Sequence, residues 1–159
     1  MSRLPELTAK VDAFFARVAE RHGDDMQCAT GCSDCCHVRL TITTAEAAAI
    51  RALVAGWTAE QRRALAEQGP ADRCAALDPA SGRCRIYAAR PLVCRSHGVP
   101  VRLTRQSLPV VETCFRNFRH TPPAADCVLD QGTLSALLLA VNAGDATRID
   151  LSALLAELC

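Results

Sequence analysis

The feature that most constrains this chain is a dense set of cysteines. Four of them, Cys28, Cys32, Cys35 and Cys36, lie within nine residues in the stretch CATGCSDCCH, which ends in His37. Six more are spread over the rest of the chain, which makes ten cysteines in 159 residues. Such a set indicates a disulfide framework, a reactive thiol or a metal site, and each of these dictates which segments must meet in the fold.

The N-terminal stretch bears on the redox compartment. Residues 1–15, MSRLPELTAKVDAFF, include Glu6, Lys10 and Asp12 and no continuous apolar run, so they predict neither a signal peptide nor a membrane helix. The longest apolar stretch, LSALLLAV at 134–141, is too short to span a bilayer. We therefore expect a cytoplasmic protein whose thiols are kept reduced, which favours metal binding or redox chemistry over disulfides.

The composition predicts one soluble globular domain. Half of the residues are hydrophobic and 22% are charged, and the length suits a single domain over 1–159, with a metal-binding core at about 28–120. The net charge of +1 gives no basis for a nucleic-acid partner, and the paired C-x2-C spacing of zinc fingers is missing. The expected partners are metal ions, with neither nucleic acid nor membrane; no particular protein partner is predicted.

Helical signals dominate the regions outside the cysteines. Residues 5–22 have apolar side chains at helical spacing. Thr43 with Glu46, and Thr58 with Gln61, have the spacing of helix-capping boxes, and Gly69-Pro70 would close the second helix.

Two further helices are predicted towards the end of the chain, at 132–144 and 150–158, the latter capped by Asp150 or Ser152. Residues 97–113 favour a short hairpin that turns near Gln106-Ser107, and its two prolines favour an edge position. The expected fold is mainly α, with about five helices around an irregular cysteine-rich centre and one short hairpin.

The cysteines suit soft metal ions. A thiolate sulfur matches zinc, iron–sulfur clusters and copper(I), and a C-x3-C-x2-C stretch can turn three sulfurs towards one centre. Eight cysteines are the candidate ligands: Cys28, Cys32, Cys35, Cys36, Cys74, Cys84, Cys94 and Cys114. They fit two four-thiolate sites, or equally one cluster and one mononuclear site.

The adjacent pair Cys35 and Cys36 bears on that choice. Neighbouring side chains usually diverge, so we expect that the two do not serve one tetrahedral ion. Either Cys36 turns into the core or there are two metal centres. Outside this set, Cys127 is read as a small buried hydrophobe and Cys159 as a terminal thiol.

Other side chains near the cysteines suggest supporting roles. His37 and His97 flank the clusters. We expect each of them to hydrogen-bond to a metal ligand in preference to binding the metal itself. Guanidinium groups could offset the negative charge of several thiolates, and four arginines crowd the second cysteine region: Arg83, Arg85, Arg90 and Arg95.

One enzyme class shares part of the pattern. Cys28, Cys32 and Cys35 have the C-x3-C-x2-C spacing of radical S-adenosylmethionine enzymes. Those enzymes need a barrel of repeated βα units, whereas this chain is short and has hardly any strand pattern. We set that class aside but keep the iron–sulfur cluster as an alternative.

The second cysteine region resembles a known family. CRIYAARPLVCRSHG at 84–98, together with CATGCSDCC, resembles the YkgJ-type cysteine-cluster family, also called the CxxCxxCC zinc- or iron-chelating domain. The residues that carry the resemblance are Cys84, Ile86, Tyr87, Arg90, Pro91, Cys94 and Arg95, with Cys74 before them and Cys114 after. Three residues separate Cys28 from Cys32, where the family's short name implies two. The resemblance implies metal chelation by cysteines.

These observations lead to one expected function and two alternatives. We expect a protein that coordinates zinc or iron, with the iron as single ions or in an iron–sulfur cluster, and that has a metal-handling or structural role. The alternatives are an iron–sulfur-dependent oxidoreductase or other redox enzyme, and a zinc-stabilised interaction domain. The sequence singles out no catalytic residue.

Overall fold

The computed structural model describes residues 3–66 and 72–159. The chain forms two compact units, which we describe separately: unit 1 consists of residues 1–28 and 92–143, and unit 2 of residues 29–91 and 144–159. The described residues form six α-helices and small sheets, so the prediction of a mainly α fold is confirmed. A single metal-binding domain over 1–159 stays a prediction.

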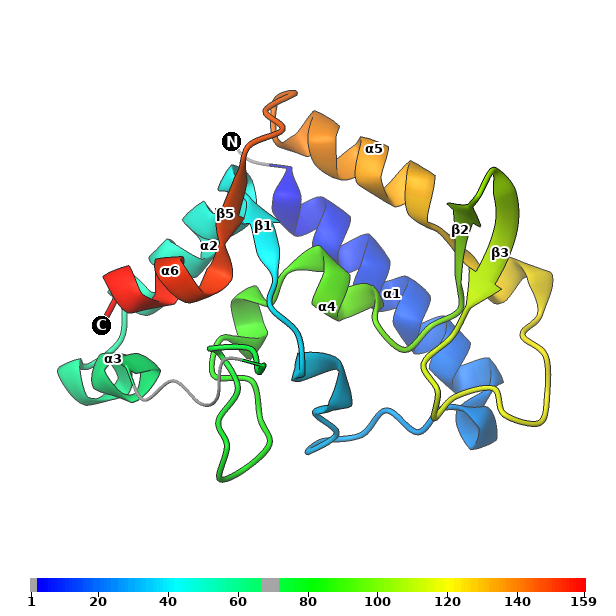
Figure 1. Ribbon diagram of the computed structural model, residues 1–159, viewed down its shortest axis with the longest axis horizontal. Helices are drawn as coiled ribbons and strands as arrows, with labels where there is room; N and C mark the ends of the chain where they lie inside the picture. Colours follow the sequence, from blue (N-terminus) through cyan, green and yellow to red (C-terminus); the bar gives the residue numbers. More distant parts are fainter. Residues whose placement is uncertain (1–2, 67–71) are drawn as a thin grey trace. The chain divides into compact units, whose positions relative to one another are not determined.

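Unit 1 is built on a long N-terminal helix. Its elements are α1 (Leu4–Arg21), η1 (Gly23–Asp25), α4 (Leu92–Ser96), β2 (Val101–Arg105), β3 (Leu108–Glu112), η4 (Ala125–Cys127), β4 (Leu129–Asp130) and α5 (Gln131–Val141). Helix α1 runs beside α5, as Figure 1 shows in blue and orange. Leu7 and Val11 are one turn apart on α1 and therefore lie on the same face of the helix. They pack there with Leu92 of α4 and Leu134 of α5.

The hairpin of unit 1 confirms the predicted turn. Strands β2 and β3 are antiparallel with Leu103 opposite Val110, and Gln106 and Ser107 between them have φ angles of 49° and 66°. Two successive positive φ angles are typical of a type I′ hairpin turn. Strand β2 is central because β4 pairs with it in parallel, so the predicted edge position holds for β3, which contains Pro109, and is wrong for β2.

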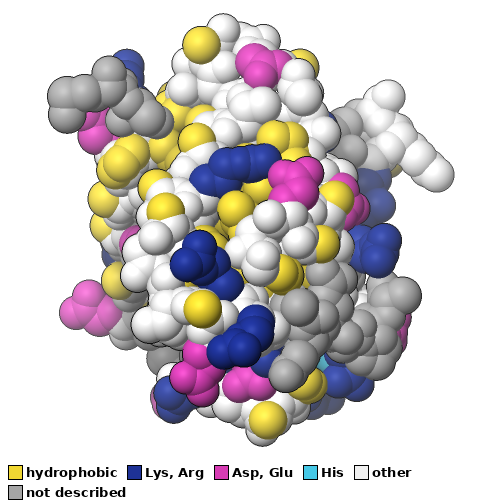
Figure 2. All heavy atoms as spheres, turned by 90° about the vertical axis from the view of Figure 1, so that its left-hand side faces the viewer, with side chains coloured by type: hydrophobic (Ala, Val, Ile, Leu, Met, Phe, Trp, Pro, Cys, Tyr) yellow, Lys and Arg dark blue, Asp and Glu magenta, His cyan; other side chains and the backbone are white. Residues whose placement is uncertain are grey.

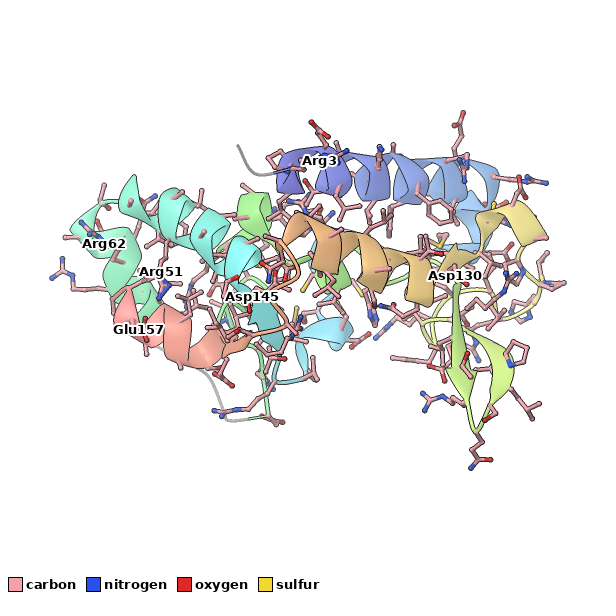
Figure 3. All side chains as sticks on the ribbon, turned by 90° about the horizontal axis from the view of Figure 1, so that it is seen from above. Arg3, Arg51, Arg62, Asp130, Asp145 and Glu157 are labelled. Atoms are coloured by element: carbon pink, nitrogen blue, oxygen red, sulfur yellow. The ribbon has the colours of Figure 1, made fainter. Side chains whose placement is uncertain are left out.

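Unit 2 combines three helices with a two-stranded sheet. Its elements are η2 (Asp34–Cys36), β1 (Thr41–Thr43), α2 (Thr44–Ala55), α3 (Ala59–Ala66), η3 (Tyr87–Ala89), β5 (Arg148–Asp150) and α6 (Leu151–Glu157). Strands β1 and β5 are antiparallel, with Ile42 opposite Ile149. Figure 3 shows the side chains of Arg51 from α2 and Glu157 from α6, which form an ion pair of 2.9 Å.

The caps of the unit 2 helices follow the sequence signals. The Thr43 Oγ1 accepts from the Glu46 backbone N–H at 3.3 Å, and the buried Glu46 carboxylate accepts from the Thr43 N–H at 2.9 Å. Thr58 and Gln61 form the same reciprocal pair, while Gly69-Pro70 lies outside the described residues. Asp150, and not Ser152, caps α6 by accepting from the Ala153 N–H at 2.9 Å.

The core of unit 2 reaches into the cysteine-rich segments. Apolar side chains of α2, α6 and β1 pack together there with Cys74, Ala75, Ala76 and Ile86, and Cys36 and Cys84 pack against this cluster while half-buried. The cysteine segments are therefore packed against the hydrophobic core of unit 2. Among the described residues, no helix is both long enough and apolar enough to cross a membrane.

Candidate metal centre

A small closed loop carries two of the candidate ligands in unit 2. Leu77 and Cys84 face each other in an antiparallel bridge, and the Arg85 N–H donates to the Ala76 carbonyl at 2.8 Å. The tip of the loop is held by Asp78, whose carboxylate accepts from the Ser81 hydroxyl at 2.5 Å and whose pKa is lowered chiefly by this bond. The loop thus folds back on itself and returns Cys84 to the neighbourhood of Cys74, ten positions earlier in the chain.

A backbone bond joins this loop to the first cysteine cluster. The Cys74 N–H donates to the Cys36 carbonyl at 2.7 Å, within unit 2. Near the other end of the loop, a Cβ on Gly82 would lie 3.0 Å from the Gly31 carbonyl oxygen, so the two backbones are in close contact there. Cys35, Cys36, Cys74 and Cys84 are therefore brought together from three stretches of chain.

Burial and the charge of neighbouring thiols both change the pKa values of these cysteines. Burial raises the pKa of Cys84 to about 11, and it also raises the pKa of Cys74. Negative charge on neighbouring thiols adds to both effects: Cys35 acts on Cys74 and Cys84, and Cys74 acts on Cys84 and Cys36. Without a cation, several thiolates in this place would repel one another, whereas a bound soft metal ion would compensate their charge.

The adjacent pair does not diverge as the sequence suggested. The Cys36 thiol hydrogen-bonds to Cys35, which lowers the pKa of Cys35 to about 7 and raises that of Cys36. The two residues lie on the 3-10 turn η2. The expectation of divergence is wrong, although Cys36 does pack against the core cluster of unit 2.

One of the predicted arginines acts on this cluster. The positive charge of Arg90 lowers the pKa of both Cys35 and Cys84, and its guanidinium lies 4.2 Å from the centre of the Tyr87 ring. Arg85 instead donates to the Ala64 carbonyl at 2.6 Å, and Arg95 pairs with Asp12 at 2.5 Å within unit 1. Arg90 is thus placed to offset thiolate charge, while Arg85 and Arg95 hold the backbone and α1.

The remaining candidate ligands are held differently. Cys32 follows a tight turn in unit 2, with its N–H donating to the Ala29 carbonyl at 3.0 Å. Cys28, Cys94 and Cys114 belong to unit 1, where Cys94 lies on α4 and the Cys114 carbonyl accepts from the Asn117 N–H at 2.9 Å. The structure therefore draws together four of the eight candidates and assigns three others to unit 1.

The two cysteines excluded from the ligand set have the predicted surroundings. Cys127 is fully buried and packs with Val18 and Val99 in an apolar cluster of unit 1. Cys159 is exposed at the chain end, with its thiol donating to the Leu155 carbonyl at 3.1 Å. All ten cysteines lie in the described ranges, and all are thiols and not disulfides.

The histidines that flank the cysteines lie at the surface. His37 follows η2 and is exposed. His97 also reaches the surface, but partial burial of its ring lowers its pKa. A lowered pKa keeps the imidazole neutral at ordinary pH, which is the form that binds metal or accepts a hydrogen bond.

The four thiols match a soft metal ion in the chemical type of their donor atoms. They are soft donors in a half-buried place with a guanidinium beside them, as a thiolate-bound metal requires. Within residues 3–66 and 72–159, however, no group of three or more His, Cys, Asp or Glu side chains has the arrangement of a metal-holding set.

The charged side chains on one face of the molecule are of mixed sign. On the face shown in Figure 2, arginine and lysine side chains alternate with acidic and apolar ones and form no continuous basic stripe. This agrees with the small net charge of +1.

The comparison with protein families agrees with the cysteine pattern. Residues 27–114, more than half of the chain, match the family described as "CxxCxxCC: Putative zinc- or iron-chelating domain". The chain belongs to this family, and the recognition made from the residues is confirmed. Neither the curated proteins nor the solved structures gave a match.

Sequence reasoning missed one residue beside a cysteine. The side chain of Asn117 is buried in unit 1 and donates to the Cys28 sulfur at 3.3 Å. No spacing rule points to it, because residues 28 and 117 meet only through the tertiary fold. Its closeness to Cys114 in the chain was the one available signal.

Proposed function

We propose that this protein binds zinc or iron through cysteine thiolates in a reducing, cytoplasmic compartment and has a metal-handling or structural role. The observation that carries the proposal is the gathering of Cys35, Cys36, Cys74 and Cys84 within unit 2. These four side chains come from three stretches of chain and lie close enough for the charge of one to raise the pKa of another. Membership in the chelating-domain family supports the same chemistry.

The four thiols of unit 2 are proposed as the main metal ligands, with Arg90 as the nearby positive charge. Cys32 of unit 2 and Cys28, Cys94 and Cys114 of unit 1 are proposed as further ligands. A thiolate-bound zinc ion would supply folding free energy and no redox chemistry, whereas iron would add electron transfer. The residues themselves do two things: they present soft donors, and they keep those donors partly shielded from water.

The proposal is tested by purifying the protein without oxygen and measuring its visible spectrum, metal content and acid-labile sulfide. About one or two firmly held zinc or iron ions per chain are expected. Brown colour with sulfide would indicate an iron–sulfur cluster, and a colourless zinc protein would indicate a closed thiolate site. A protein that holds neither metal would overturn the proposal.

Two variants locate the metal. Cys74→Ser should lose metal, because it removes a buried sulfur that lies near Cys35, Cys36 and Cys84. Cys159→Ser is the matched control, because its thiol is exposed at the chain end and contacts a carbonyl of α6. Equal metal content in the two variants would contradict the assignment of the ligands.

A further inference from the structure

Asn117 joins the segments that carry two of the proposed ligands of unit 1. Its side chain is buried, with 2% of the residue exposed. Its backbone N–H donates to the Cys114 carbonyl at 2.9 Å, and the next residue, Phe118, donates its N–H to the Asp25 carbonyl at 2.9 Å. The turn after Cys114 is thereby fixed against the segment that leads to Cys28.

The orientation of the Asn117 amide is determined by two backbone partners. Its Oδ1 accepts from the Gln27 N–H at 2.8 Å, and its Nδ2 donates to the Gly98 carbonyl at 2.7 Å. Because an N–H can only donate and a carbonyl can only accept, the flipped amide would lose both bonds. The Nδ2 end must therefore face the side where Gly98 lies.

Sulfur atoms lie on that same side. The Asn117 Nδ2 is 3.3 Å from the Cys28 Sγ and 3.6 Å from the Met26 Sδ. One amide hydrogen is used by the Gly98 carbonyl, which leaves the second for the sulfurs. A buried amide that already satisfies the backbone of two segments thus also donates to a candidate ligand.

The backbone of Gly98 also contacts the Cys28 sulfur. Its φ angle is 106°, a conformation that L side chains rarely adopt, and a Cβ there would lie 2.6 Å from the Cys28 Sγ. The cysteine sulfur therefore rests against the bare backbone of Gly98 and also meets an amide donor. This is the environment expected of a sulfur held in one orientation.

We propose that Asn117 is a positioning residue for metal binding: its amide donates to the Cys28 sulfur and holds it ready as a ligand for a soft metal ion. This inference rests on the proposed function. An N–H donor stabilises the charged form of sulfur, which is the form that binds metal, and partners of this kind orient ligands in other metal proteins. Asn117 itself donates no electrons to the metal.

The test uses the full chain with Co²⁺ alone as the probe, added without oxygen and followed by the absorption of thiolate-to-cobalt charge transfer. Asn117→Asp replaces the donating NH2 by an acceptor of the same shape. We expect it to weaken Co²⁺ binding about 10- to 100-fold and to reduce the charge-transfer intensity. Asn142→Asp is the matched control, since Asn142 is also buried in unit 1 and caps α5; its cobalt affinity and spectrum should equal those of the wild type.

A double variant separates positioning from general damage. In a Cys28→Ser background, Asn117→Asp should have no further effect on cobalt binding, because the sulfur that it acts on is gone. Independent, additive losses would overturn the inference. So would a folded Asn117→Asp protein with wild-type cobalt affinity and spectrum.

A measurement on the wild-type protein covers the case in which the variant does not fold. The side-chain NH2 signals of Asn117 in an ¹⁵N NMR spectrum should shift when Zn²⁺ is added, whereas those of Asn142 should not. Signals of Asn117 that stay in place while zinc binds would overturn the inference. A wild-type protein that takes up neither Co²⁺ nor Zn²⁺ would instead overturn the proposed function.

Discussion

The two units hold their cysteines in opposite ways. In unit 2, Cys35, Cys36, Cys74 and Cys84 lie near one another, and negative charge on Cys35, Cys74 or Cys84 would disfavour the ionisation of a neighbouring thiol. In unit 1, Cys28 accepts a hydrogen bond from the amide of Asn117, and Cys127 is packed as an apolar side chain.

The difference shows that spacing along the chain does not by itself decide what a cysteine does. Cys127 is more deeply buried than Cys84, yet its neighbours are Val18 and Val99, and no other thiol is among the members of its cluster. Cys84 has thiols and a guanidinium around it instead. We therefore propose that the groups around a cysteine, and not its spacing, distinguish a candidate ligand from a residue such as Cys127 that packs as a small hydrophobe.

The largest expected effect separates metal binding from stability. Cys84→Ser should lower metal affinity by more than about a hundredfold, because it removes a ligand and not merely a supporting group. Cys127→Ser should keep the metal but cost about 1–3 kcal/mol, because it buries a hydroxyl among apolar side chains. Metal analysis and urea unfolding measure the two effects. A Cys127→Ser protein that loses its metal while folded would remove the contrast between the units.

A second prediction concerns the contact between Gly98 and the Cys28 sulfur in unit 1. Gly98→Ala should destabilise the protein by about 2–3 kcal/mol, because it combines backbone strain with a clash against the Cys28 sulfur. Gly144→Ala is the control: its φ angle is also positive, at 78°, but nothing lies within 4 Å of the added Cβ. It should cost only about 1 kcal/mol from strain. Equal losses in urea unfolding would show that the Cys28 sulfur does not fill the space beside Gly98.

The smallest expected effect is a dependence on pH in the metal-free protein. The pKa of Cys84 is 9.0 in the unfolded chain and about 11 in the folded one, so the unfolded state loses its proton first. The contribution of Cys84 to stability should therefore be full below pH 9 and fall as the pH rises through about 11.

Urea unfolding at pH 9 and at pH 11, with and without metal, measures this fall. The variant Cys84→Ala should show a shallower decline, and bound metal should suppress it, since coordinated sulfur is already deprotonated. Metal-free stability that stays level or rises over this range would contradict the raised pKa and the crowding of thiols behind it.

The local parts of the fold were predictable from the sequence. Helix α1 and the two Thr-initiated helices follow from apolar spacing and capping residues, which act within one or two turns of chain. The I′ turn at Gln106-Ser107 was located although its conformation is strained for those residues. Helix α4 was missed, even though Pro91 stands immediately before it, where proline favours the start of a helix.

The parts that depend on distant contacts were not predictable. Strand β1 pairs with β5 across more than a hundred residues, and three-residue strands carry too little alternation to be recognised. The same reason applies to the site. The eight candidate ligands came from spacing and resemblance, but which four approach one another depends on the Cys36–Cys74 backbone bond and on the closed loop before Cys84.

The central claim is that sulfur atoms of cysteine bind the metal, and X-ray absorption at the metal edge of protein purified without oxygen tests it most directly. We predict a first shell made mainly of sulfur, at about 2.3 Å if the metal is zinc. In Cys74→Ser, that shell should lose sulfur, whereas in Cys159→Ser it should stay as in the wild type. A first shell of nitrogen and oxygen at about 2.0–2.1 Å in the wild type would contradict the account.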